Sequence, residues 1–256
     1  MSRMRMQYGW LPDLPDYRDH RYAAPRKVLA KLPRKVDLRA HCPPVLDQGE
    51  LGACTAHAIA NAHRYDQIRQ KARNAFLPSR LFIYYNERVM ERTVGEDAGA
   101  MIRDGIKSIA KQGACPENLW SYDIRKFTRK PPAKAYREAE RHQAISYQRV
   151  ERSLTQMKGC LAAGTPFVFG FSVYESFESP RVARTGNMPM PGRGERSLGG
   201  HAVLAVGYDD AKQVFTVMNS WSERWGDKGY FYMPYAYLAD TNLADDLWAI
   251  TIVETV

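Results

Sequence analysis

The sequence predicts an α+β fold with two lobes, the first helical and the second rich in strands. Before Gly164, apolar residues recur mainly at helical spacing, whereas after it they gather in short, aromatic-rich runs typical of strands. Because helices and strands are segregated along the chain, alternating β-α-β units are not expected. The 256 residues are 45% hydrophobic and 25% charged, which is the composition of a folded protein and excludes a disordered one.

The first part of the chain contains the helical signals. The apolar face of the first helix runs from Ala56 to Ile68 at helical spacing. Pro78 suits the first turn of the second helix, and Gly113 ends the third. Five helices are therefore expected, at residues 54–72, 78–90, 100–112, 134–143 and 153–163.

The second part contains short apolar runs bounded by turn residues, which predict strands. Residues 178–200, which follow the first of these runs, are rich in Gly, Pro and Arg. We expect this stretch to be a long, irregular and solvated loop that could gate a neighbouring site. No apolar stretch is long enough for a transmembrane helix, so no membrane partner is expected. The expected strands are residues 166–173, 201–208, 214–219, 229–233 and 248–253.

The net charge of +9 is concentrated at the N-terminus. Residues 1–35 contain nine Lys and Arg against three Asp, together with four prolines, and so account for +6 of the total. We interpret residues 1–35 as an extended, mostly irregular basic arm. Residues 36–256 form the main domain, with a helical lobe at roughly 45–145 and a β-rich lobe at roughly 146–250 that also includes 36–44. No stacking aromatics interleave with the basic residues, so no nucleic-acid partner is expected.

The N-terminal sequence and the cysteines indicate in which cellular compartment the protein is expected. Arg3 and Arg5 are followed by no apolar core of a secretory signal, so a cytoplasmic location is expected, with export by a specialised route left open. The four cysteines match no zinc-binding spacing and are expected to be reduced in the cytoplasm. No metal or other cofactor is expected.

Cys54 differs from the other cysteines because it opens the helix predicted at 54–72. Gly49 and Gly52 mark a tight turn just before it. A thiol at a helix N-terminus lies at the positive end of the helix dipole, which favours the nucleophilic thiolate. Such a nucleophile needs an imidazole and a group that orients the imidazole.

His201 and Asn219 are the candidates for those two roles. His201 begins an apolar strand after Gly199 and Gly200, which allow close approach of a ligand backbone, and Asn219 ends the next strand. Two adjacent antiparallel strands can present both side chains together. A cysteine early in the chain, with His and Asn 147 and 165 residues later, is the order seen in papain and the cathepsins.

Five stretches of the sequence resemble papain-like cysteine peptidases of the C1 type, in their bacterial-style form. They occur in the order of the family and, with residues 36–39, cover most of residues 36–256. The stretches are QGELGACTAHA (48–58), EDAGAMIRDGI (96–106), GACPENLWSYD (113–123), GGHAVLAVGYD (199–209) and NSWSERWGDKGYFYMP (219–234).

The resemblance implies a papain-like fold, in which a cleft separates a helical left lobe from an antiparallel β-barrel-like right lobe. It implies a cysteine-type endopeptidase that acts through a Cys54 thiolate, a His201 imidazolium and an acyl-enzyme intermediate. Asn219 would orient His201, and Gln48 would donate to the oxyanion beside the Cys54 backbone N–H. The substrate-binding residues would be Gly99, Ala100, Gly200, Ala202 and Trp221, the last also covering the His201–Asn219 pair.

Three departures from the family pattern affect details of the site. Thr55 follows the nucleophile where an aromatic residue is usual, and Leu51 occupies a position where many members have a disulfide cysteine. Ala98-Gly99 replaces a pair of glycines in the substrate-binding motif. The loss of the disulfide cysteine agrees with a reducing compartment.

Two other functions stay open. A thiol amidase or transferase could use the same residues on the same fold, and a peptide-binding module without activity could keep the fold alone. The arm is either a flexible tail or a propeptide-like, self-inhibitory segment of a zymogen, in which residues 9–12 (GWLP) would supply an aromatic anchor. The expected partners are a peptide or protein substrate and the chain's own arm, and a monomer is expected.

Overall fold

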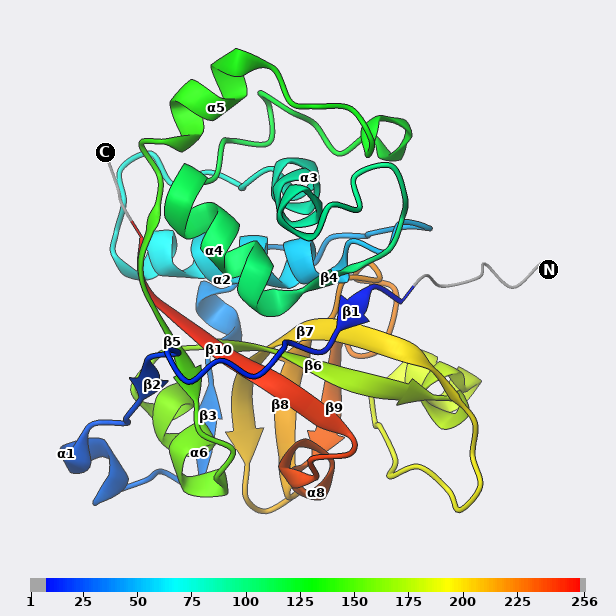
Figure 1. The fold of residues 1–256 in the computed structure, drawn as a ribbon. Helices are drawn as coiled ribbons and strands as arrows, with labels where there is room; N and C mark the ends of the chain where they lie inside the picture. The colour runs from blue at the N-terminus through cyan, green and yellow to red at the C-terminus, as the bar shows by residue number, and fades with distance from the viewer. Residues whose placement is uncertain (1–7, 254–256) are drawn as a thin grey trace.

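A group of helices lies on one side of a large sheet in the computed structural model, which describes residues 8–253 (Figure 1). Arg3 and Arg5 lie outside the described residues. Helix α2 packs directly on the sheet and is in turn covered by α3 and α4. This helical group contains α2 (Cys54–Arg69), α3 (Arg80–Glu91), α4 (Ile102–Gln112) and α5 (Ala133–Ala139).

The sheet has eight strands in the order β2-β5-β10-β6-β7-β8-β9, with β3 paired to β7. All neighbours are antiparallel except β2, which runs parallel to β5. The path ends on β2 and β9, so the sheet is open and does not close into a barrel. The strands are β2 (Arg21–Tyr22), β3 (Lys35–Asp37), β5 (Ala144–Val150), β6 (Phe167–Tyr174), β7 (Ser197–Asp209), β8 (Val214–Met218), β9 (Tyr230–Pro234) and β10 (Ala244–Val253).

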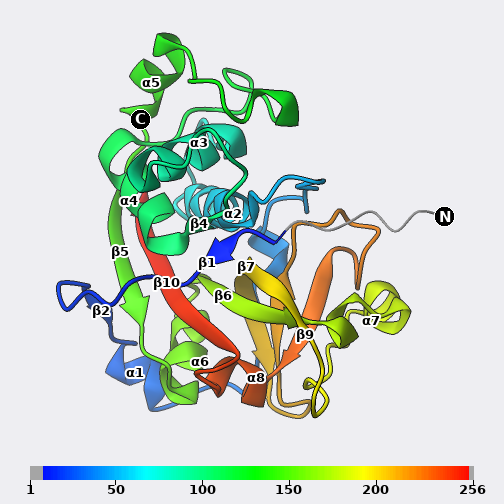
Figure 2. The same cartoon turned by 45° about the vertical axis from the view of Figure 1, so that its right-hand side comes forward.

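Shorter elements complete the chain. Strands β1 and β4 form a separate parallel pair that joins the arm to the helical group (Figure 2). The remaining elements are β1 (Trp10–Leu11), α1 (Arg26–Leu29), η1 (Arg39–His41), β4 (Ala100–Met101), η2 (Ile124–Lys126), α6 (Leu154–Ala162), η3 (Glu175–Glu178), α7 (Pro180–Thr185) and α8 (Tyr235–Ala239). No helix among the described residues is both long and apolar enough to cross a bilayer.

The predicted α+β class is confirmed, while several local expectations need correction. Pro78 precedes α3 instead of occupying its first turn, because the Ser79 side chain accepts the Phe82 N–H and caps the helix. Residues 178–200 are not a structureless loop, since they contain α7 and the start of β7. The arm is more ordered than expected because β1 and β2 find strand partners far along the chain.

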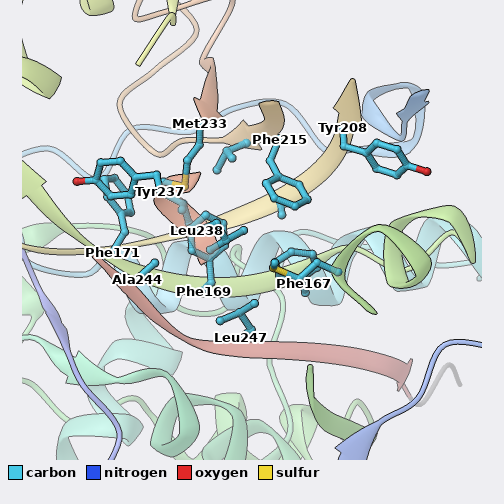
Figure 3. Packing of buried hydrophobic residues seen from close by; sticks show 14 of the residues in the cluster. Phe167, Phe169, Phe171, Tyr208, Phe215, Met233, Tyr237, Leu238, Ala244 and Leu247 are labelled. Atoms are coloured by element: carbon cyan, nitrogen blue, oxygen red, sulfur yellow. The ribbon is translucent and has the colours of Figure 1, made fainter. Parts of the chain in front are cut away.

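An aromatic core fills the side of the sheet opposite α2. Alternate residues of a strand face the same side, and on β6 this places Phe167, Phe169 and Phe171 together in that core (Figure 3). Val168, between them, faces the second core beneath α2. Phe171 reaches furthest toward the candidate site, with its ring centroid 5.7 Å from that of His201 in an edge-to-face arrangement.

Phe171→Ala is expected to lower the free energy of unfolding by about 3–5 kcal/mol, because it removes a fully buried ring and leaves a cavity. Denaturant unfolding measures the change. Ile124→Ala is the control, since Ile124 is 39% exposed and should change stability by less than about 0.5 kcal/mol. Equal losses in the two variants would contradict the assigned packing.

Candidate active site

Cys54 is the first residue of α2 and lies fully buried where this helix meets the sheet. Ala53 precedes it as the N-cap, and its side chain makes no capping hydrogen bond. The first backbone N–H groups of α2 therefore point toward the thiol without a competing cap, and the positive end of the helix dipole lies beside the sulfur. Cys54 is thus placed as the sequence predicted for a nucleophile.

His201 and Asn219 meet through neighbouring strands, β7 and the end of β8. The Nε2 atom of His201 lies 2.8 Å from Oδ1 of Asn219. Because an amide oxygen only accepts hydrogen bonds, Nε2 must carry the proton. The other ring nitrogen, Nδ1, has no hydrogen-bond partner among the described residues and, in the neutral ring, is left as the basic atom.

Aromatic rings enclose this imidazole. The Trp221 ring stacks on His201 with centroids 4.9 Å apart and an interplanar angle of 25°. Trp225 and Phe177 pack against Trp221 in turn. The His201–Asn219 hydrogen bond is therefore shielded from water, which strengthens it.

Gln48 is held against the same strand end by Ser220. Its backbone N–H donates to the Ser220 carbonyl oxygen at 2.9 Å, and its Oε1 accepts the Ser220 hydroxyl at 2.6 Å. Its Nε2 donates to the Leu51 carbonyl oxygen at 3.0 Å. This fixes the amide orientation with nitrogen toward the loop that leads to Cys54. Ser220 was missed from the sequence, although it directly follows Asn219.

The arm covers this group of side chains. Tyr8 lies over His201 and Trp221, with ring centroids 6.2 and 6.3 Å away, and donates its hydroxyl proton to Glu178. The Gly9 carbonyl oxygen accepts the Ala100 N–H at 2.7 Å. Both views of the chain show the arm crossing the boundary between helices and sheet (Figures 1 and 2).

The arm backbone passes through a gap that admits no side chain. A Cβ added to Gly9 would lie 1.8 Å from the carbonyl oxygen of Gly52. A Cβ on Gly99, whose φ is 74°, would lie 2.2 Å from the Gly9 oxygen. Glycine is therefore required on both the arm and the body at this crossing.

Burial controls the protonation of the site. It raises the pKa of the Cys54 thiol to about 11, against the smaller lowering effects of nearby Ala202 and Gly9 backbone groups. It lowers the pKa of His201 to about 4, opposed by the hydrogen bond to Asn219. With the arm docked, thiol and imidazole are both neutral at pH 7. The thiolate expected from the helix dipole is not the favoured form here, because burial raises the pKa of the thiol above 7.

The five expected substrate-binding residues all lie along the surface beneath the arm. Gly99 and Ala100 line it from the helical side, where they meet Gly9 and β1. Gly200 lies under Trp10, and Trp221 lies beside Tyr8. Ala202 is buried next to the Cys54 thiol.

Asp97 is a further residue of the site that the sequence did not reveal. Both of its carboxylate oxygens accept the Gly52 N–H, each at 3.0 Å, and one also accepts the Tyr84 hydroxyl. That same hydroxyl accepts the Gly99 N–H at 3.3 Å. Asp97 therefore ties the loop before Cys54 to the segment that faces the arm.

Thr55, the departure from the family pattern, has a buried partner. Its hydroxyl donates to Glu87 at 2.7 Å, and neither residue is exposed. Burial raises the pKa of Glu87 well above its ordinary value, which favours the neutral form of the carboxyl. A polar pair thus fills the space behind the first turn of α2. Within residues 8–253, no three His, Cys, Asp or Glu side chains gather into a group that could hold a metal ion.

Residues 32–249 match the model of the papain family cysteine proteases. A peptidase C1-like protein of Acanthamoeba polyphaga mimivirus is 44% identical and covers 97% of this chain and 88% of its own. The crystal structure of Xylellain, a cysteine protease from Xylella fastidiosa, is 44% identical with a TM-score of 0.90, covering 100% of this chain and 98% of that one. ProCathepsin B S9 from Trypanosoma congolense shares the fold, with a TM-score of 0.73 at 17% identity over 89% of this chain and 80% of that one.

Asp97→Asn is expected to lower the free energy of unfolding by about 1–3 kcal/mol and to speed amide exchange at Gly52, because a charged acceptor of that N–H is lost. Hydrogen exchange with denaturant unfolding measures both effects. The control is Glu96→Gln, which removes an adjacent, exposed carboxylate. Unchanged exchange at Gly52 would show that Asp97 does not hold the loop.

Proposed function

The chain belongs to the papain family and is a cysteine protease, and we propose that Cys54, His201, Asn219 and Gln48 perform its peptide-bond hydrolysis. The observation that supports this most strongly is the His201–Asn219 hydrogen bond. It holds the proton on Nε2, so that Nδ1 of the neutral ring is the atom able to accept the thiol proton. The roles follow from this assignment.

The proposed reaction begins when the arm leaves and water reaches the site. His201 Nδ1 takes the proton of Cys54, and the thiolate sulfur bonds to the substrate carbonyl carbon. The Cys54 backbone N–H and the Gln48 side-chain amide stabilise the resulting oxyanion. His201 then returns the proton to the leaving amine as the C–N bond breaks, which leaves an acyl-enzyme.

Hydrolysis of the acyl-enzyme repeats the same proton transfers. His201 accepts a proton from water, the hydroxide adds to the thioester carbon, and the sulfur departs as the acid product forms. Asn219 keeps the imidazole in one tautomer throughout. Trp221 keeps water away from the His201–Asn219 bond while leaving Nδ1 on the open side of the ring.

A peptide is the favoured ligand of this surface. The arm already lies on it as an extended segment that pairs with β4 through backbone hydrogen bonding. An amidase or transferase using the same residues would need no such pairing edge, and a binding module without activity would need no oriented imidazole. Both observations favour peptide hydrolysis over the two alternatives.

We further propose that the arm inhibits the enzyme to which it belongs. Tyr8 covers His201 and Trp221, and the Gly9 backbone lies beside the Cys54 thiol. A substrate carbonyl cannot reach the sulfur while Gly9 is there. The arm also keeps the thiol protonated by excluding water, so it blocks both access and activation. The fold is shared with structures of procathepsins, which supports a zymogen-like arrangement.

Cys54→Ala is expected to abolish hydrolysis of a fluorogenic peptide library, because no nucleophile remains. Gln48→Ala should lower kcat by about 10²–10³-fold with little change in KM, because its amide acts on the oxyanion of the transition state. Steady-state kinetics measure both. Gln143→Ala, which removes a side-chain amide that donates to the Lys111 carbonyl oxygen, is the control. An unchanged kcat in Gln48→Ala would show that Gln48 does not stabilise the oxyanion.

Tyr8→Ala combined with Trp10→Ala is expected to speed alkylation of Cys54 by iodoacetamide at pH 7 by at least about tenfold. The reason is that rehydration lowers the thiol pKa from about 11, so more thiolate is present at pH 7. Peptide mass mapping identifies alkylation at Cys54, and the pH dependence of the rate should move to lower pH.

The control for the arm is Tyr17→Ala, because Tyr17 belongs to the same segment and is 99% exposed. It should leave the alkylation rate at the value of the unaltered chain. An equal rate in all three proteins would show that the arm does not limit access to the thiol.

A further inference from the structure

Trp10 of the arm lies in a narrow slot in the sheet, next to the candidate active site. Only 8% of the residue is exposed. The slot exists because β6 and β7 both have a glycine there. A Cβ on Gly170 would lie 2.0 Å from ring atom Cε2 of Trp10, and a Cβ on Gly200 would lie 2.7 Å from ring atom Cε3. Any side chain at either position would close the slot.

Asp246 lies at the polar end of the slot and is 1% exposed. Its Oδ2 accepts the Trp10 indole N–H at 3.1 Å and the Asp13 backbone N–H at 2.8 Å. Its Oδ1 accepts from Arg149 at 3.0 Å. Asp246 also has a φ of 58°, a conformation that non-glycine residues adopt at a cost.

The two oxygens of Asp246 thus have different partners. The body of the protein supplies Arg149 for one, whereas both hydrogen bonds to the other come from the arm. When the arm leaves, Oδ2 loses those two donors in a buried place, and an unsatisfied buried acceptor is costly. A ligand that replaces the arm regains this energy only if it brings an N–H group to Oδ2.

The slot lies where a side chain of a bound substrate can enter it. Gly9 lies beside the Cys54 thiol, and Trp10 is the next residue. A peptide that lies along the same surface, with a carbonyl at Cys54, therefore has a side chain one or two residues away that can enter the slot.

We propose that this slot is a specificity pocket selecting tryptophan, and that the arm docks by presenting Trp10 as a substrate would. The inference rests on the proposed peptidase function. The flat gap between the two glycines fits a planar ring, and Asp246 accepts the N–H that distinguishes tryptophan from phenylalanine. An arginine is disfavoured because Arg149 already compensates the Asp246 charge and also pairs with Asp245.

The binding test uses the full chain with Trp10→Ala, which empties the slot, and Cys54→Ala, which prevents turnover. Fluorescein-labelled hexapeptides with Trp, Phe, Arg or Ala at each position in turn are titrated by fluorescence anisotropy. At one position Trp should bind about tenfold more tightly than Phe, which is the effect of one hydrogen bond to a charged acceptor. Equal binding of Trp and Phe, tighter binding of Arg, or no binding by any peptide would overturn the proposal.

Two further variants locate the selectivity. Asp246→Leu, which leaves no acceptor at this position, should reduce the Trp-to-Phe ratio to near one. Gly170→Ala should weaken binding of the Trp and Phe peptides together and leave binding of the Ala peptides unchanged. Thermal unfolding checks that each variant is folded, and the Trp-to-Phe comparison in the protein with Asp246 intact does not depend on these variants. A Trp-to-Phe ratio that survives Asp246→Leu would exclude Asp246 as its source.

Cleavage of the same peptides separates this inference from the proposed function. Trp10→Ala with Cys54 intact should cleave the Trp peptide with the highest kcat/KM. Cleavage without a Trp preference refutes the pocket and leaves the peptidase assignment in place. A Trp preference in binding without any cleavage refutes the proposed hydrolysis and leaves the pocket in place.

Discussion

The packing of α2 on β7 is the contact on which the candidate site depends. The helix contacts the strand, and small residues of both, Ala56 and Ala60 on α2 and Ala202 on β7, belong to one buried cluster. Small residues let the helix lie close to the sheet. As a result Cys54, at the start of α2, lies beside Ala202 and near the His201 that precedes it on the strand. The helix dipole and the imidazole can then act on one sulfur atom.

The same closeness makes the site sensitive to what covers it. Cys54 and His201 are fully buried with the arm in place, and removal of water favours the neutral form of each. Under the proposed self-inhibition, the arm would need no charged contact with the thiol to suppress the thiolate. A single docking event would then affect both the access of a substrate and the protonation of the proposed nucleophile.

The basic composition of the arm does not show which of its residues contact the rest of the protein. Although the arm is strongly basic, several of its polar contacts with the body come from its acidic residues. Asp13 accepts the Arg103 backbone N–H and the Trp248 indole N–H, and Asp19 pairs with Arg103 and Arg149. Several of its basic side chains, such as Arg18, remain largely exposed. The acids of the arm therefore contribute to its docking together with Tyr8, Trp10 and the Lys35–Asp209 ion pair, and net charge alone does not describe these contacts.

Local periodicity predicted α2 to α6 and β6 to β10, and the order of the motifs pointed to Cys54, His201, Asn219 and Gln48, because these signals lie within short stretches of the chain. Periodicity did not predict β5 or the short strands β1 to β4. The register of β7 on β8 is what brings His201 and Asn219 within hydrogen-bonding distance. Only the tertiary structure revealed Asp97 at Gly52, Glu87 behind Thr55, and Asp246 in the slot of Trp10. These contacts join residues 45, 32 and 236 positions apart, and they obey no period that a sequence pattern could display. The order of the arm belongs to the same class, because its short strands are stable only when distant parts of the chain are already in place.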